Sequence, residues 1–144
     1  MVTDNEFILS KIPHKRPYRF IDNISEVNDM HISGSFFLDP SLDFYTGHFP
    51  GSNLTPGFVI TEIMAQIGIL GLGIFINMNK LDGINGAFLA TSEIKFHAMS
   101  YSGDTIYVES KRIYFRFGKL KCSIQAFNQN RVLVCSGIFS GFTQ

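Results

Sequence analysis

The amino-acid sequence predicts an α+β fold in which one long helix packs against an antiparallel sheet of about six strands. Residues 58–78 form a long apolar stretch, and residues 105–116 begin a region in which apolar and polar side chains alternate. Two runs rich in β-forming residues precede the stretch. A chain of 144 residues is long enough for one core, so we expect a single domain over residues 1–144.

The apolar stretch predicts a buried helix rather than a membrane span. Residues 58–78 have the length that a span needs, but Glu62 and Gln66 interrupt them, and the uninterrupted part, residues 67–76, is too short. A helix that is apolar all round needs cover on every side. Its glycines lower helix propensity by about 1 kcal/mol each relative to Ala, which predicts that another element packs closely against them. They are Gly68, Gly71 and Gly73.

The remaining segments read as strands. Residues 18–24 and 30–38 predict a first hairpin, with its turn at residues 25–29. After the helix, we expect a meander of about four strands over residues 88–97, 105–116, 120–126 and 131–142. A hot-dog fold fits this order, and so does a cystatin-like or other helix-on-sheet domain.

Composition narrows the range of functions. Lys plus Arg equals Asp plus Glu at 12 each, so no overall field steers nucleic acid or a charged membrane toward the chain. The acidic N-terminus lacks the features of a secretory signal. Cys122 and Cys135 suit buried thiols in a reducing cytoplasm, and a cross-strand disulfide is the alternative. We expect a cytoplasmic protein that binds no nucleic acid and does not insert into membranes.

Gly and Pro are dense in the loop before the helix, residues 45–57. Thr55 suits the N-cap and Pro56 the first helical position, so the helix should start there. Gly57 then presents a free N–H at the helix N-terminus. Such an amide can stabilise a developing oxyanion, and glycine leaves room for a ligand carbonyl. Ordinary capping explains the same residues equally well.

Two titratable residues flank that helix start. Glu62 follows about two turns into an apolar helix, where an ionised carboxylate is costly to bury unless a cation or a polar stripe accompanies it. His48 lies in the loop, where a histidine alone is commonly just solvated. Together with Gly57, they form an acid/base constellation without a nucleophile elbow. The four histidines are scattered singly, which disfavours a zinc site.

These residues resemble the signature of the FabZ-type 3-hydroxyacyl-(acyl-carrier-protein) dehydratases. The resemblance covers nearly the whole chain and is most specific in the loop and helix. It rests on Gly47-His48-Phe49-Pro50-Gly51, Pro56-Gly57 and Glu62-Ile63-Met64-Ala65-Gln66, and less specifically on Ile12-Pro13-His14-Lys15-Arg16-Pro17, Phe20-Ile21-Asp22, Lys95-Phe96 and Gly103-Asp104.

The resemblance implies a hot-dog dimer in which His48 of one subunit meets Glu62 of the other. His48 would remove the C2 proton of a (3R)-3-hydroxyacyl thioester, and Glu62 would help the C3 hydroxyl leave, giving a trans-2-enoyl thioester. Gly57 N–H would hold the thioester oxygen, and Gln66, at i+4, could orient Glu62. Phe49, Phe58 and Met64 are candidates for an apolar acyl tunnel, with core packing as the alternative.

The resemblance also implies the partners of the chain. It implies an acyl carrier protein that bears the substrate, no metal or organic cofactor, and either a homodimer, which could assemble further into a hexamer, or a heterodimer with a homologous dehydratase. The pathway would be fatty-acid synthesis or a specialised polyene or lipid pathway. Two other readings remain open: a non-catalytic subunit that binds acyl chains or completes a heterodimer, and a thioesterase on the same fold.

The chain departs from the family pattern in two regions. Asn53, Phe58 and Ile63 replace smaller or more rigid residues near the site, which leaves the preferred acyl length open. Residues 97–104 carry few basic residues, which weakens the expected docking surface for an acidic carrier protein. Other basic side chains could provide the docking surface instead, although each of them can also be explained as an ordinary solvated surface residue. They are Lys11, Lys15, Arg16, Arg112, Arg116 and Lys119. Glu rather than Asp at position 62 favours dehydration without isomerisation.

Overall fold

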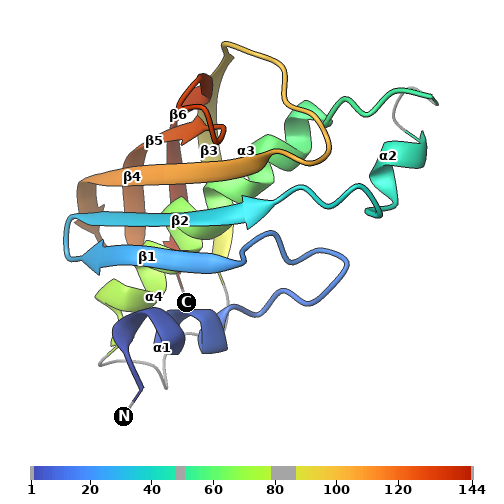
Figure 1. Ribbon diagram of the computed structural model, residues 1–144. Coiled ribbons are helices and arrows are strands. Elements are labelled where there is room, and N and C mark those ends of the chain that lie inside the picture. Colours follow the sequence, from blue (N-terminus) through green and yellow to red (C-terminus); the bar gives the residue numbers. More distant parts are fainter. Residues whose placement is uncertain (1, 48–50, 79–86, 144) are drawn as a thin grey trace.

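The computed structural model describes residues 2–47, 51–78 and 87–143. A six-stranded antiparallel sheet curves around a long helical segment, and a short N-terminal helix packs beside its first strand (Figure 1). The strands are β1 (Asn23–Asn28), β2 (His31–Phe37), β3 (Ala87–Phe96), β4 (Thr105–Arg116), β5 (Lys119–Phe127) and β6 (Leu133–Thr143). The helices are α1 (Asp4–Lys11), α2 (Phe44–Gly47), α3 (Gly57–Ala65), the π-helix η1 (Gln66–Gly71) and α4 (Leu72–Ile76).

The strand order is β1-β2-β4-β5-β6-β3. Strands β4, β5 and β6 form the expected meander, but β3 pairs with β6 rather than with β4. The predicted meander of four strands is therefore wrong at its first member, because the helix carries the chain from β2 to the far edge of the sheet. Periodicity identifies strands without specifying which of them pair.

The segment Gly57–Ile76 is long and apolar enough to cross a membrane by length and composition, yet 72% of an 18-residue apolar stretch within it is buried inside this chain. Close packing at its glycines is confirmed at two positions. A Cβ at Gly68 would lie 2.5 Å from Ile124 Cδ1, and one at Gly71 would lie 2.9 Å from Ile32 Cδ1. Both contacts come from the inner face of the sheet, so the missing side chains let helix and sheet meet.

The N-terminal segment differs from the prediction. The first strand begins at Asn23 instead of Tyr18, and its turn lies at residues 29–30. Before it comes α1, which was not predicted although Thr3 and Glu6 have capping-box spacing and form that box. The backbone of residues 18–20 bonds the Gln66 side chain instead of a strand, which is why its β-forming residues gave a misleading signal.

The start of α3 also differs. Pro56, not Thr55, occupies the N-cap, and no side chain caps the helix. The Thr55 hydroxyl is instead 2.8 Å from the hydroxyl of Tyr45, and Thr55 N donates to Ser100 O at 2.8 Å. Burial raises the pKa of Tyr45, an effect that its bond to Thr55 partly offsets. A buried hydroxyl needs a hydrogen-bond partner. The Tyr45 hydroxyl pairs with the Thr55 hydroxyl, which was expected to cap the helix.

Gly68→Ala is expected to lower the free energy of unfolding by about 1–3 kcal/mol, because the added methyl group would meet Ile124 and Ser110. Urea unfolding followed by circular dichroism measures this loss. The matched control is Gly47→Ala, since a Cβ at Gly47 meets nothing within 4 Å. Equal urea midpoints for the two variants would contradict close packing at Gly68.

Tyr45→Phe should destabilise the chain by about 1–3 kcal/mol, because it leaves the buried Thr55 hydroxyl without its partner. Replacing both residues, as Tyr45→Phe with Thr55→Val, should recover most of that loss, because no polar group then remains unpaired. Thermal unfolding of the two single variants and the double variant tests the bond. Additive losses would show that the two hydroxyls do not interact.

Candidate active site

Glu62 lies on α3, where the helix passes the N-terminal segment. Its Oε2 accepts a hydrogen bond of 2.8 Å from Gln66 Nε2, so the contact expected from their i, i+4 spacing is present. The expectation of a buried carboxylate is wrong for the single chain, in which Glu62 is partly exposed. This part of α3 extends beyond the fully covered middle of the helical segment, so one side of Glu62 remains open.

Gln66 anchors Glu62 to the N-terminal segment. The side chain is 1% exposed, and all of its polar atoms have partners. Besides its bond to Glu62, Nε2 donates to Tyr18 O at 2.9 Å, while Oε1 accepts from Phe20 N at 2.7 Å. A buried amide that is satisfied in this way holds a fixed rotamer. Gln66 therefore gives Glu62 a rigid neighbour.

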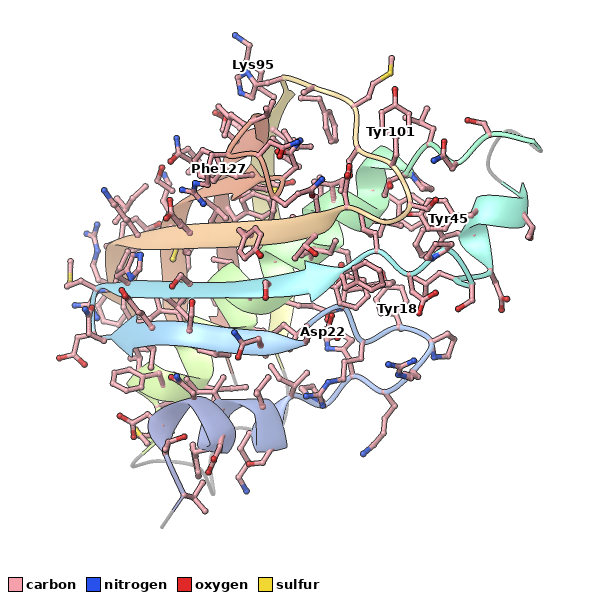
Figure 2. The ribbon with its side chains drawn as sticks, in the orientation of Figure 1. Tyr18, Asp22, Tyr45, Lys95, Tyr101 and Phe127 are labelled. Carbon is pink, nitrogen blue, oxygen red and sulfur yellow. The ribbon has the colours of Figure 1, made fainter. Side chains whose placement is uncertain are left out.

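Tyr18 borders Glu62 and was not among the predicted site residues. Its ring contacts those of His14 and Phe20, at centroid distances of 5.8 and 5.3 Å, and the residue is 48% exposed. Figure 2 labels Tyr18 in the loop before β1. Burial raises the pKa of the Tyr18 phenol, and the charge and hydrogen bonding of Glu62 raise it further. The sequence gives no local signal for this contact, because Tyr18 reaches the helix only through the fold.

Gly57 is the first residue of α3, so its N–H points out of the helix end and has no intrahelical acceptor. A Cβ at this position would lie 2.9 Å from Phe96 Cζ, so a side chain here would displace the Phe96 ring. Beside Gly57 lies an apolar hollow of about 240 Å³, which Ile60 and Met99 also line. The helix end thus combines an available amide with space for an apolar group.

The remaining predicted residues fall into three groups. Phe58 is 62% exposed, whereas Met64 has no exposed surface and packs in the core. A contact of either residue with an acyl chain stays a prediction. His48 and Phe49 lie outside the described residues, so the structure gives no His48–Glu62 distance.

Within the part of the chain that the structure describes, no group of three or more His, Cys, Asp or Glu side chains could hold a metal ion.

Large apolar side chains are exposed around the helix end and along β3. A grouping of this kind is typical of a protein or ligand interface. Its members are Phe58, Leu89, Phe96, Met99 and Tyr101.

Comparison with known proteins places the chain among thioester dehydratases. The FabA-like domain family matches residues 12–127. The 3-hydroxyacyl-(acyl-carrier-protein) dehydratase FabZ of Acetivibrio thermocellus is 34% identical over 88% of this chain and 84% of its own length. The FabZ of Lawsonia intracellularis is 31% identical over 88% of this chain and 83% of its own length.

Solved structures confirm the predicted hot-dog fold. The dehydratase heterocomplex ApeI:P from Xenorhabdus doucetiae superposes with a TM-score of 0.77 at 11% identity, covering 95% of this chain and 90% of the other. A hypothetical thioesterase with coenzyme A from Streptococcus pneumoniae superposes with a TM-score of 0.63 at 18% identity, covering 84% of each chain. The fold is thus shared by dehydratases and thioesterases, but the sequence matches in the loop and helix single out one group. The chain belongs to the FabA-like family and, within it, to the FabZ type.

Proposed function

We propose that this chain dehydrates a (3R)-3-hydroxyacyl thioester, carried by an acyl carrier protein, to the trans-2-enoyl thioester. The observation that carries the proposal is the position of Glu62 in a FabZ-type chain. Gln66 holds its carboxylate at 2.8 Å on the helix whose first amide belongs to Gly57. An acid and an oxyanion donor on one rigid element suit the elimination of water next to a thioester carbonyl.

In this reaction His48 acts as the base and Glu62 as the acid. His48 removes the C2 proton, and negative charge develops on the thioester oxygen. The Gly57 N–H and the dipole of α3 stabilise that oxygen, while Glu62 gives a proton to the departing C3 hydroxyl. The apolar hollow beside Gly57 accommodates the methylene groups next to the reacting carbons. No metal or organic cofactor takes part.

The catalytic unit is a dimer that forms through β3. This strand pairs with β6 on one side only and lies at the edge of the sheet, so its other side can pair with a second copy. Exposed Leu89 and Phe96 on β3 would be covered by that pairing. His48 of one subunit then serves Glu62 of the other. A homologous dehydratase could replace the second copy, an arrangement supported by the likeness to the ApeI:P heterocomplex.

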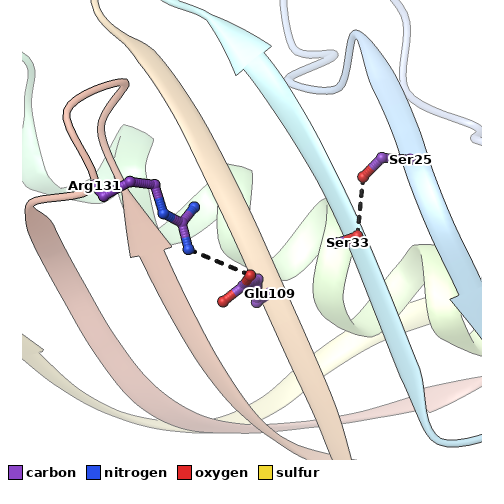
Figure 3. A network of polar contacts seen from close by, with 4 residues as sticks. All are labelled: Ser25, Ser33, Glu109 and Arg131. Carbon is purple, nitrogen blue, oxygen red and sulfur yellow. Dashed lines mark hydrogen bonds and ion pairs between the residues drawn. The ribbon is translucent and has the colours of Figure 1, made fainter.

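Charge is segregated along the chain despite its net balance. All 12 acidic residues precede residue 110, and six of the 12 basic residues follow it. Among the later ones, Arg131 is 3.4 Å from Glu109 at the β5–β6 end of the sheet (Figure 3). At the opposite end, Arg116, Lys119 and Lys121 form what we call the basic surface of the β4–β5 hairpin.

The basic surface is suited to an acidic partner. Arg116 and Lys119 face each other across the hairpin, where like charges are destabilising. Aromatic rings offset part of this cost, since Arg116 lies 4.3 Å from the centroid of Tyr114 and Lys119 lies 5.8 Å from that of Phe142. These contacts leave the positive charges unneutralised. An acyl carrier protein, being acidic, would supply the missing countercharge.

The proposed dimer would bring the basic surface of one subunit to the site of the other. Two copies related by a two-fold axis pair identical edges in antiparallel directions. The Phe96 end of β3 lies beside Gly57, and its other end, Ala87, pairs with Thr143 next to Phe142 and Lys119. The hairpin of one subunit would therefore stand on the same side as Gly57 of the other, where a tethered substrate must enter. We place this activity in the cytoplasm, in fatty-acid or related lipid or polyene synthesis.

The acid/base assignment is tested with purified protein and a 3-hydroxyacyl thioester. The wild type should generate enoyl absorbance, and His48→Ala and Glu62→Gln should each lower kcat by about 10²–10⁴-fold, because each removes a proton-transfer group. The matched control is Glu109→Gln, which changes a carboxylate at the other end of the sheet. Full activity in both site variants would exclude the mechanism, and release of free thiol without enoyl product would indicate a thioesterase. Activity that appears only after a homologous dehydratase is added would indicate a heterodimer.

Carrier recognition is tested by charge reversal. Lys119→Glu should lower kcat/KM for a 3-hydroxyacyl chain on its carrier protein by about tenfold at low salt, and less as salt rises, because surface charges act mainly on association. The same variant should be unchanged with a small N-acetylcysteamine thioester. Arg131→Glu reverses an equal charge at the opposite end and serves as control. Equal losses in the two variants would refute a specific role for the basic surface.

A further inference from the structure

The turn of the β4–β5 hairpin holds a phenylalanine in an unfavourable backbone conformation. Arg116 and Lys119 pair across the hairpin, so Phe117 and Gly118 form the turn between them. Both have a positive φ, 51° for Phe117 and 77° for Gly118. A two-residue turn of this kind favours Asn-Gly, Asp-Gly or Gly-Gly, because a bulky side chain with a positive φ is crowded by its own backbone. Asn at position 117 would therefore suit the turn better than Phe.

The side chain of Phe117 gains no burial in return. The residue is 101% exposed, so its ring lies fully in water, although phenylalanine is among the residues most often buried in proteins. Backbone strain of this kind is found most often at functional sites. An exposed aromatic ring that becomes buried only in a complex is typical of the anchor residues of protein–protein interfaces. Phe117 therefore has the character of a binding residue.

The surroundings of Phe117 indicate the charge of its partner. The turn lies within the basic surface, between two of its three cations. No acidic residue follows Glu109 in the sequence. Beside the Phe117 ring is a hollow of about 310 Å³, which the rings of Tyr114 and Phe142 also line. A surface that combines aromatic rings with positive charge suits an acidic partner with apolar side chains among its acidic ones.

We propose that Phe117 is the apolar anchor of carrier recognition, and that its ring inserts between apolar side chains of the acyl carrier protein. The inference rests on the proposed function and adds to it a contact that does not depend on charge. The charges of the basic surface act mainly on association, whereas a buried ring acts mainly on dissociation. In the proposed dimer, the turn would stand on the same side as Gly57 of the other subunit. A carrier anchored there would hold its thioester beside that site.

Phe117→Asn separates this role from folding, because it removes the ring and supplies a residue that the turn favours. The midpoint of thermal unfolding should therefore stay the same or rise. For a 3-hydroxyacyl chain on its carrier protein, kcat/KM should fall by about tenfold, whereas for the N-acetylcysteamine thioester it should not change. The loss should persist as salt rises, unlike that of Lys119→Glu, because salt does not screen an apolar contact.

Two further variants serve as controls. Phe117→Tyr keeps an aromatic ring and should retain most of the wild-type kcat/KM on the carrier-borne substrate. Met30→Asn makes the matched change in the turn of the β1–β2 hairpin, where Met30 is 51% exposed. This hairpin lies at the edge of the sheet opposite β3, so the variant should change neither rate. A loss in Met30→Asn equal to that in Phe117→Asn would contradict a specific role for Phe117.

The remaining outcomes separate the carrier protein from other partners. An unchanged kcat/KM on the carrier-borne substrate in Phe117→Asn would overturn the inference, and so would equal losses on both substrates, which would indicate an effect on the site or the fold. With unchanged carrier kinetics, loss of binding to phosphatidylglycerol vesicles in Phe117→Asn would indicate a lipid surface instead. Loss of an assembly larger than a dimer, measured by sedimentation velocity, would then indicate a second copy of this chain. A wild-type protein that dehydrates neither thioester would overturn the proposed function.

Discussion

The middle of the helical segment, Gln66–Gly71, is buried on all sides, and the rest of the structure depends on that constraint. Strands β2, β4, β5 and β6 all reach its π-helical turn, and Gly68 and Gly71 let them approach. Cover of this kind leaves a buried polar residue in the helix no access to water. Gln66 is such a residue, so its amide must be satisfied by protein, and the backbone of residues 18–20 does so. The position of Glu62 follows from how Gln66 is satisfied.

The sequence allows the helix, the six strands and the Gln66–Glu62 contact to be predicted, because all of these follow from local period or spacing. It does not allow the position of β3, the Tyr45–Thr55 bond or the contact of Tyr18 with Glu62 to be predicted, since these join segments distant along the chain. A helical period of 3.6 residues or a strand period of 2 says which face is buried, but not what covers it. The early placement of the first strand has the same origin, because the backbone of Tyr18 and Phe20 bonds the side chain of Gln66, which is distant along the chain.

The middle of the helix and its N-terminal end have different roles. The middle is packed against the sheet of its own chain, whereas the end carries a partly exposed Glu62, an available Gly57 amide and exposed Phe58. Chemistry is therefore possible only where intramolecular burial stops. In the proposed dimer, the second subunit would cover this end of the helix. The separation of acidic from basic residues along the chain would then serve recognition of the acidic carrier protein. Within a single chain, the basic surface of the β4–β5 hairpin lies at the end of the sheet away from Gly57. In the proposed dimer, the two-fold axis would bring this surface of each subunit to the site of the other.

The order of the elements along the chain has a consequence for synthesis in the cell. The apolar helix precedes three of the four strands that cover its centre, since β4, β5 and β6 all follow it in sequence. During translation it therefore leaves the ribosome as an uncovered segment, with the length and hydropathy of a membrane span. Only when β6 has emerged can the sheet close over it. Until then the nascent chain exposes an apolar surface that would otherwise be buried, which makes this stage of synthesis prone to aggregation.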